Sequence, residues 1–108
     1  MATTPKVLAQ SNPSAASLTA VYTVAALTTA VINRIVAANR STIATSIRVS
    51  VAIAGAADTL SQYVAYDTAI GGNECLPLPG CTLGPADVVR VYATLSTVSF
   101  NIFGVELT

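Results

Sequence analysis

The chain has 108 residues, of which 53% are hydrophobic and only 9% are charged, and its formal net charge is +0. This length fits one domain with one modest core. The five basic residues are scattered and balanced by five acidic ones, which excludes the basic stripe that nucleic-acid binding requires. We expect so weakly charged a surface to be covered by copies of the same chain, in a homo-oligomer.

A membrane-spanning helix is not expected either. The most apolar stretch, residues 21–38, is interrupted by threonines and by Asn33 and Arg34, and an arginine alone is costly in a bilayer. The N-terminal residues lack the compact apolar segment of a secretory signal. We therefore expect no membrane partner.

Residues 1–16 are predicted to form an N-terminal arm. Within it, residues 6–10 have the composition of a short edge strand, and Ser-Asn-Pro-Ser at 11–14 favours a turn. The arm pairs with the chain's own sheet or reaches a neighbouring subunit, and the alternative is a flexible terminus. Further along the chain, alternating or β-branched residues predict strands over 18–23, 30–38, 43–53, 62–67, 87–95 and 98–107.

The segment 43–53 has the clearest pattern, because its aliphatic residues occupy odd positions and small or polar residues occupy even ones. Side chains of a strand alternate between its two faces. We therefore expect a core strand whose wetter face carries Arg48 and Ser50. Its buried face is predicted to consist of Ile43, Ile47, Val49, Val51 and Ile53.

The strands 30–38 and 43–53 are not expected to form a tight hairpin. A three-residue connection would set Arg34 directly opposite Arg48, and like charges in that position repel. The two strands are therefore joined by a longer loop with a shifted register, or they belong to different sheets.

Two features predict irregular strands near the C-terminal half. Pro77 and Pro79 limit residues 74–78 to a short edge strand, since proline has no backbone donor. In 98–107 the apolar positions change parity after Ile102. We expect a bulge or twist there, which Gly104 would permit.

Seven to eight short strands separated by turns predict an all-β protein, a single antiparallel β-sandwich over residues 1–108 of jelly-roll or immunoglobulin-like type. Little helix is expected.

The residue types argue against catalysis and metal binding. The chain has no His, which removes most general-base and zinc arrangements, and its carboxylates lie beside turns. We expect no enzyme activity, no cofactor and no metal site. The tyrosines and phenylalanines are interpreted as core and interface residues rather than as a sugar-stacking platform. The triplet Asn39-Arg40-Ser41 matches an N-glycosylation acceptor formally, but no secretory signal accompanies it.

Cys75 and Cys81 are separated by five residues that include Pro77, Pro79 and Gly80. The chain could double back there and bring the thiols together in a disulfide, if the protein meets an oxidising environment. The alternative is two buried reduced thiols that act as small apolar side chains. Both interpretations stay open from the sequence.

Several segments together resemble a group of small structural proteins of tailed bacteriophages. These are PKVLAQSNP at 5–13, VYTV at 21–24, NRS at 39–41, QYVAYD at 62–67 and FNIFGVE at 100–106. The resemblance spans nearly the whole chain, but its motifs are turns and strand ends. The two cysteines and the Pro77–Pro79 segment depart from the pattern.

This resemblance implies a virion protein that is assembled in the host cytoplasm. We expect a capsid decoration (cement) protein that binds itself, with a trimer as one possible form, and that binds the major capsid protein or other virion proteins. The alternatives are a tail, baseplate or fibre-associated protein, or a small carbohydrate-binding module that recognises a host. A hydrolase is the most remote class, because the chain lacks His.

Overall fold

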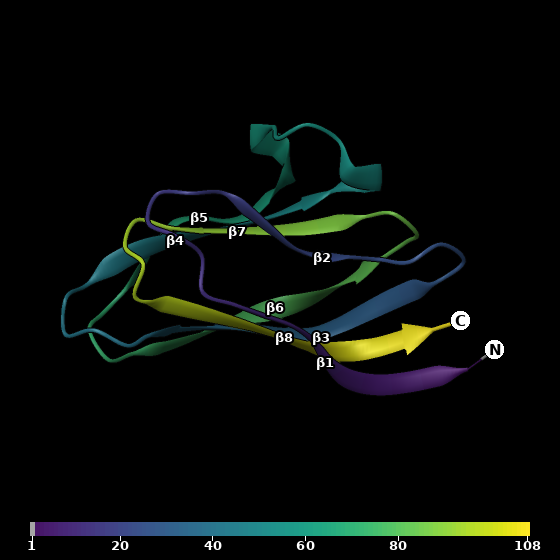
Figure 1. The fold of residues 1–108 in the computed structure, drawn as a ribbon, viewed down its shortest axis with the longest axis horizontal. Coiled ribbons are helices and arrows are strands. Elements are labelled where there is room, and N and C mark those ends of the chain that lie inside the picture. Colours follow the sequence, from purple (N-terminus) through teal and green to yellow (C-terminus); the bar gives the residue numbers. More distant parts are fainter. Residues whose placement is uncertain (1) are drawn as a thin grey trace.

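The computed structural model describes residues 2–108, which form two four-stranded antiparallel sheets packed face to face (Figure 1). The connection between β4 and β5 contains two 3₁₀ helices, η1 (Ile53–Gly55) and η2 (Leu60–Gln62). The strands are β1 (Thr3–Ser11), β2 (Thr19–Thr23), β3 (Thr29–Asn39), β4 (Thr45–Ala52), β5 (Tyr63–Ile70), β6 (Cys75–Leu83), β7 (Val88–Ala93) and β8 (Val98–Leu107). The predicted all-β sandwich is confirmed.

The strand order decides between the two predicted topologies. Sheet A has the order β1-β8-β3-β6 and sheet B the order β2-β7-β4-β5. The pairs β1–β8, β2–β7, β3–β6 and β4–β5 are those of one long antiparallel ladder that has been rolled up on itself. This is the arrangement of a jelly roll.

The separation of β3 from β4 agrees with the charge argument. β3 lies in sheet A and β4 in sheet B, so Arg34 and Arg48 are on different sheets. Of the alternatives for the N-terminal arm, the described residues take the pairing with the chain's own sheet, because β1 pairs with β8 along its length; residue 1 of the predicted arm lies outside the described residues.

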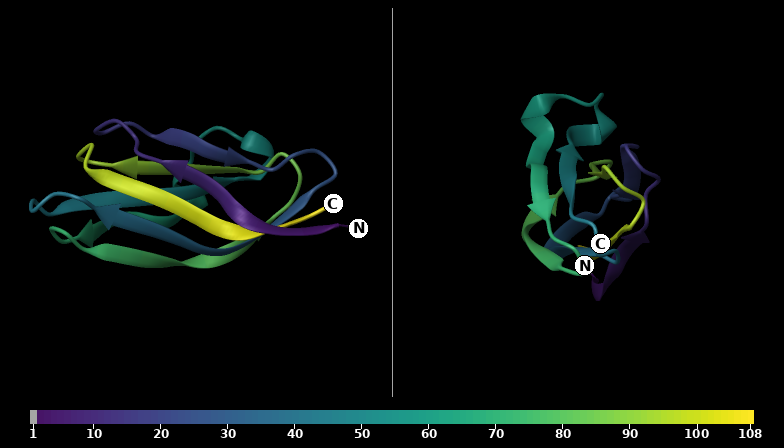
Figure 2. Two further views of the ribbon diagram at one scale, coloured as in Figure 1. Left: turned by 60° about the horizontal axis from the view of Figure 1, so that its bottom comes forward. Right: turned by 90° about the vertical axis from the view of Figure 1, so that its left-hand side faces the viewer.

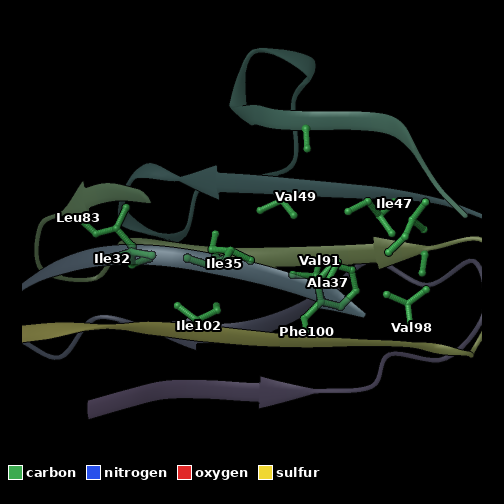
Figure 3. Close-up of a cluster of buried hydrophobic side chains, with 14 of the residues drawn as sticks. Ile32, Ile35, Ala37, Ile47, Val49, Leu83, Val91, Val98, Phe100 and Ile102 are labelled. Atoms are coloured by element: carbon green, nitrogen blue, oxygen red, sulfur yellow. The ribbon is translucent and has the colours of Figure 1, made fainter. Parts of the chain in front are cut away.

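The core lies between the sheets and draws side chains from both (Figure 3). Ile35, Phe100 and Ile102 enter it from sheet A, and each is at most 1% exposed. Ile47, Val49 and Val91 meet them from sheet B and are fully buried. Complete burial of such side chains is the main favourable contribution to the stability of the sandwich.

The predicted core strand was correct in its centre and wrong at both ends. Ile47 and Val49 are buried and Val51 is partly buried, but Ile43 is 63% exposed and Ile53 is 78% exposed. β4 begins at Thr45 and ends at Ala52, so Ile43 lies in the preceding loop and Ile53 begins η1. Alternation assigns a face only where the strand itself continues.

The prediction that Ser50 lies on a hydrated face of β4 is also wrong, because Ser50 is fully buried. Its pairing partner on β7 is Arg90, which points away from the core and donates to the carbonyl oxygens of Gly55 and Ala56. The segment 53–62 therefore lies over this part of the outer face of sheet B and excludes water from Ser50.

The irregularity expected near Gly104 is present, but on the neighbouring strands. β8 keeps Phe100, Ile102 and Gly104 on its buried side, while the register shifts opposite it on β1 and on β3. A side chain at Gly104 would clash with the carbonyl oxygen of Val31. Glycine therefore allows β3 to approach β8 closely at this point.

β6 is an edge strand, as the prolines predicted, but it runs from Cys75 to Leu83 and is longer than expected. It pairs only with β3, where Pro77 lies opposite Val36 and Pro79 opposite Arg34. The prolines are compatible with a long strand because one side of it needs no hydrogen-bond partner.

The loops gather at the two ends of the sandwich (Figure 2). At one end Asn39 joins three loops: its amide donates to the carbonyl oxygens of Ile43 and Gly71, and its side-chain oxygen accepts from Ser41 and Thr97. The opposite end carries both termini and the connections β2–β3, β4–β5 and β6–β7. Within residues 2–108, no helix has the length and hydropathy of a membrane span.

Candidate subunit interface

The outer face of sheet A presents a row of four residues that crosses all its strands. Val7 on β1 pairs with Phe103 on β8, Phe103 with Arg34 on β3, and Arg34 with Pro79 on β6. Val7 is 48% exposed and Phe103 is 39% exposed, and Arg34 and Pro79 are exposed as well. Large apolar side chains exposed at the middle of a sheet are a typical mark of a contact surface.

The rows on either side extend this surface. We call the three rows together the sheet A face. One flanking row is Pro5, Val105, Val31 and Thr82, and the other is Gln10, Asn101, Val36 and Pro77. Apart from Arg34, all of these residues are uncharged. The face is therefore mainly apolar with a single positive charge near its centre, a composition typical of interface cores.

The Arg34 guanidinium has no acceptor within residues 2–108. The two ion pairs of this part of the chain are Lys6–Glu106 and Arg48–Asp67, while Arg40 and Arg90 donate to Ser96 and Ala56. Arg34 is exposed, so water hydrates it in the free protein. A partner that covers the sheet A face would have to supply an acceptor, because burying an unpaired charge is costly.

The whole outer side of sheet A, of which the sheet A face is the middle, has the size of a modest interface. Four strands about 4.8 Å apart and about nine residues long, at about 3.3 Å per residue, cover about 570 Å² in plan. Docking one partner would bury about 1,100 Å² in total, which is near the lower limit of specific interfaces. A single contact of this size is weak, and it becomes strong only when it is repeated.

A second exposed apolar surface is the segment 53–62, which covers part of the outer face of sheet B and projects from it (Figures 1 and 2). Ile53 is 78% exposed and Leu60 is 77% exposed. The carboxylate of Asp58, between them in the chain, accepts a hydrogen bond from the hydroxyl of Tyr63 at 3.1 Å. The segment thus presents two aliphatic side chains and one carboxylate.

Internal hydrogen bonds hold the segment 53–62 in place. The backbone N–H of Ala54 donates to Asp87 Oδ1 at 2.9 Å, and Arg90 Nη2 donates to the carbonyl oxygen of Ala56 at 3.0 Å. Thr59 and Gln62 form a capping box around η2. These contacts fix the backbone of the segment before any partner arrives, which lowers the entropy cost of binding.

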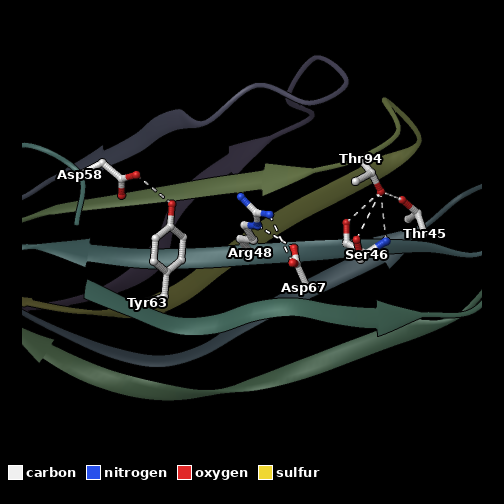
Figure 4. Close-up of polar contacts among 7 residues, drawn as sticks. All are labelled: Thr45, Ser46, Arg48, Asp58, Tyr63, Asp67 and Thr94. Carbon is white, nitrogen blue, oxygen red and sulfur yellow. Dashed lines mark hydrogen bonds and ion pairs between the residues drawn. The ribbon is translucent and has the colours of Figure 1, made fainter. Parts of the chain in front are cut away.

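The outer face of sheet B carries a polar and aromatic cluster on its other half (Figure 4). The Arg48 guanidinium lies 4.3 Å from the ring centroid of Tyr66 and 4.7 Å from that of Tyr92. It also donates to both carboxylate oxygens of Asp67, at 2.6 and 3.3 Å. Cation–π contacts and a two-point ion pair together make this a rigid group.

The aromatic rings of this cluster already contact Arg48 or one another. Tyr66 contacts Arg48 and also packs edge to face with Tyr63, with ring centroids 5.0 Å apart. Burial and the hydrogen bond to Asp58 raise the pKa of Tyr63. A sugar would have to displace Arg48 to stack on the covered ring faces, so the cluster fits a structural role better than a glycan platform.

A third polar group links the two sheets. Tyr22 on β2 donates to Glu106 on β8 at 2.6 Å, and Lys6 on β1 forms an ion pair with Glu106 at 2.8 Å. The hydrogen bonds from Lys6 and Tyr22 lower the pKa of Glu106, whereas burial and the contact with Glu106 raise the pKa of Tyr22. This group fixes the edge of sheet B against sheet A.

The disulfide between Cys75 and Cys81, one of the two interpretations that the sequence left open, is not formed. Both cysteines lie on β6 and are free, so the extended chain holds their Cα atoms about 20 Å apart, whereas a disulfide needs about 6 Å. Cys81 packs against the core and burial raises the pKa of its thiol. Cys75 is exposed and Cys81 is only partly buried, so the alternative of two buried thiols is wrong for Cys75 and is met only in part by Cys81.

The other sequence motifs do not form a site. Asn39 of the glycosylation triplet is 3% exposed, and its side chain is used fully inside the fold. No group of three or more metal-ligating side chains occurs in the described part of the chain, residues 2–108. A shallow depression at one end of sheet A is lined by Gln10 and Asn101, whose amides bond to each other.

The fold and surfaces define a small jelly-roll protein with an apolar sheet face. Comparison with family models, with curated proteins and with solved structures gave no match. The functional argument therefore depends on the surfaces described above.

Sequence reasoning did not find the sheet A face. Val7, Arg34, Phe103 and Pro79 come from four separate parts of the chain, and they form a row only because of the strand order. One signal was present in the sequence. The apolar residues change from even to odd positions at Phe103, which indicates that this aromatic side chain lies outside the core.

Proposed function

We propose that this protein is a non-catalytic structural component of a bacteriophage virion, where many copies decorate and stabilise the capsid. The observation that carries the proposal is the sheet A face, which is mainly apolar, exposed and centred on an arginine without an acceptor. A protein that acts alone in solution has little use for such a surface.

The jelly-roll topology supports the proposal as an analogy. Double-sheet jelly rolls occur in viral capsid proteins, and also in lectins and cupins. Fold alone does not assign function. The low charge and the resemblance to phage structural proteins favour the first of these groups.

The proposed mechanism is stabilisation by repetition. Each copy offers modest interfaces, and each is weak by itself. On a shell, neighbouring copies are held close together, so that every added contact forms at a high effective concentration. Loss of one capsid subunit would then require several decoration contacts to break at once.

Two alternatives use the same surfaces. A tail, baseplate or fibre-associated protein would also need repeated subunit contacts. A carbohydrate-binding module would use Tyr66 and Tyr92, but their contacts with Arg48 argue against it.

The deciding experiment is to locate the chain in purified particles. Separated capsids and tails are probed with an antibody against the chain, and decorated particles are then imaged by cryo-electron microscopy. The proposal predicts the protein on capsids, at lattice positions, in many copies. Recovery with tails alone would support the tail alternative, and absence from all particles would refute a virion role. Binding to a glycan array that Tyr66→Ala abolishes would favour the carbohydrate module.

A further inference from the structure

We propose that copies of this chain bind one another head to tail: the segment 53–62 of one copy docks on the sheet A face of the next. In this contact Asp58 pairs with Arg34, and Leu60 packs against Phe103. The inference rests on the proposed function, because it names the partner of the same surface.

The sheet A face cannot pair well with itself. Its three rows contain Arg34 and no carboxylate. A symmetric face-to-face dimer would bring two arginines under cover without a counter-charge, which is strongly unfavourable. A partner surface that combines apolar side chains with a negative group is therefore the best match.

The segment 53–62 has this combination. Ile53 and Leu60 are among the most exposed large apolar side chains of the described residues, and Asp58 lies between them in the chain. One carboxylate oxygen of Asp58 accepts from Tyr63, which leaves the second oxygen for an arginine.

The other carboxylates within residues 2–108 are engaged by their own surroundings. Asp67 pairs with Arg48, and Glu106 pairs with Lys6 and Tyr22. Asp87 accepts the backbone N–H groups of Gly84 and Ala54. Glu74 accepts the backbone N–H of Gly71. Within the described residues, Asp58 and Glu74 each keep one carboxylate oxygen without a partner. Of these two, only Asp58 lies in the chain between large, strongly exposed aliphatic residues, Ile53 and Leu60.

The placement of the two surfaces determines the type of assembly. The segment 53–62 stands above sheet B, and the sheet A face is on the opposite side of the sandwich (Figure 1). The segment 53–62 of one copy therefore cannot reach the sheet A face of the same copy, and each copy can bind two others. Contacts of this kind build rings or open rows. Surfaces on opposite sides favour a row or a wide ring over the trimer that the resemblance to phage structural proteins suggested.

A charge-swap series tests the contact in the purified full chain. The variants are Arg34→Glu, Asp58→Lys and the double variant with both changes, and Ser14→Asp in the exposed β1–β2 loop is the control. Sedimentation velocity measures the mass distribution over a hundredfold range of concentration. Circular dichroism checks that each variant retains its β-sheet spectrum.

The expected result is self-association of the wild type, loss of at least tenfold in apparent association for each single variant, and recovery in the double variant. The control should associate like the wild type. Failure of the double variant to recover, while both single variants are folded, would overturn the contact. A wild type that stays monomeric yet decorates capsids would also overturn it and leave the proposed function standing. A wild type that associates in the predicted way but is absent from particles would refute only the virion role.

Discussion

The sharpest test of the core assignment compares two identical substitutions at positions that the sequence pattern treats alike. Ile47 and Ile53 both belong to the alternating segment, but Ile47 is fully buried and Ile53 is 78% exposed. Ile47→Ala removes three buried carbon groups, at about 0.8 kcal/mol each. With the cavity left behind, the loss of unfolding free energy should reach about 3 kcal/mol.

Ile53→Ala should cost about 0.5 kcal/mol, because roughly a fifth of the side chain is covered. Urea unfolding followed by far-ultraviolet circular dichroism and tyrosine fluorescence measures both. With a slope of about 1.5 kcal/mol/M, the midpoint should fall by about 2 M for Ile47→Ala and by about 0.3 M for Ile53→Ala. Measurements at several protein concentrations separate folding from association. Equal shifts for the two variants would refute the strand boundaries described above.

Three further predictions follow from single contacts. Ser50→Ala should raise the unfolding free energy by about 1 kcal/mol, since the buried hydroxyl has no partner, whereas Ser50→Asp should prevent folding; a soluble, folded Ser50→Asp protein would contradict the burial. Because the folded state lowers the pKa of Glu106, the ionised carboxylate stabilises the fold above about pH 4.5, and this contribution is lost as the pH falls through the lowered pKa. Glu106→Gln should therefore flatten the pH dependence of the urea midpoint over this acidic range. A pH dependence equal to that of the wild type would argue against the role of Glu106. Gly104→Ala should cost about 2 kcal/mol or more in thermal or urea unfolding, because the new methyl group meets the Val31 backbone; a neutral result would show that β3 can move aside.

The reversal at Ser50 shows where a local pattern stops being informative. Alternation along β4 predicted that Ser50 lies on the face away from the core, and Ser50 does lie on the outer side of sheet B. It is buried because residues 53–62 cover that side, with Arg90 holding the Gly55 and Ala56 carbonyl groups. The covering segment comes from a loop whose path depends on the whole fold.

The cysteines illustrate the same point for a covalent prediction. Pro77, Pro79 and Gly80 favour a turn when only neighbouring residues are considered. Pairing with β3 along residues 75–83 extends the segment instead, because each backbone hydrogen bond to β3 forms only if β6 remains straight. Tertiary pairing thus overrides the local turn preference.

The sequence by itself determined the class of the fold and the positions of most strands. Period-two alternation and turn residues between apolar runs predicted the antiparallel sandwich, and the conflict of Arg34 with Arg48 argued against a tight hairpin between residues 30–38 and 43–53. These constraints act between residues close in the chain. Only the tertiary structure decided the jelly-roll order, the burial of Ser50 and the row of Val7, Phe103, Arg34 and Pro79. Each of these depends on which distant strands lie side by side, and that is set by the total burial of the core rather than by any one segment.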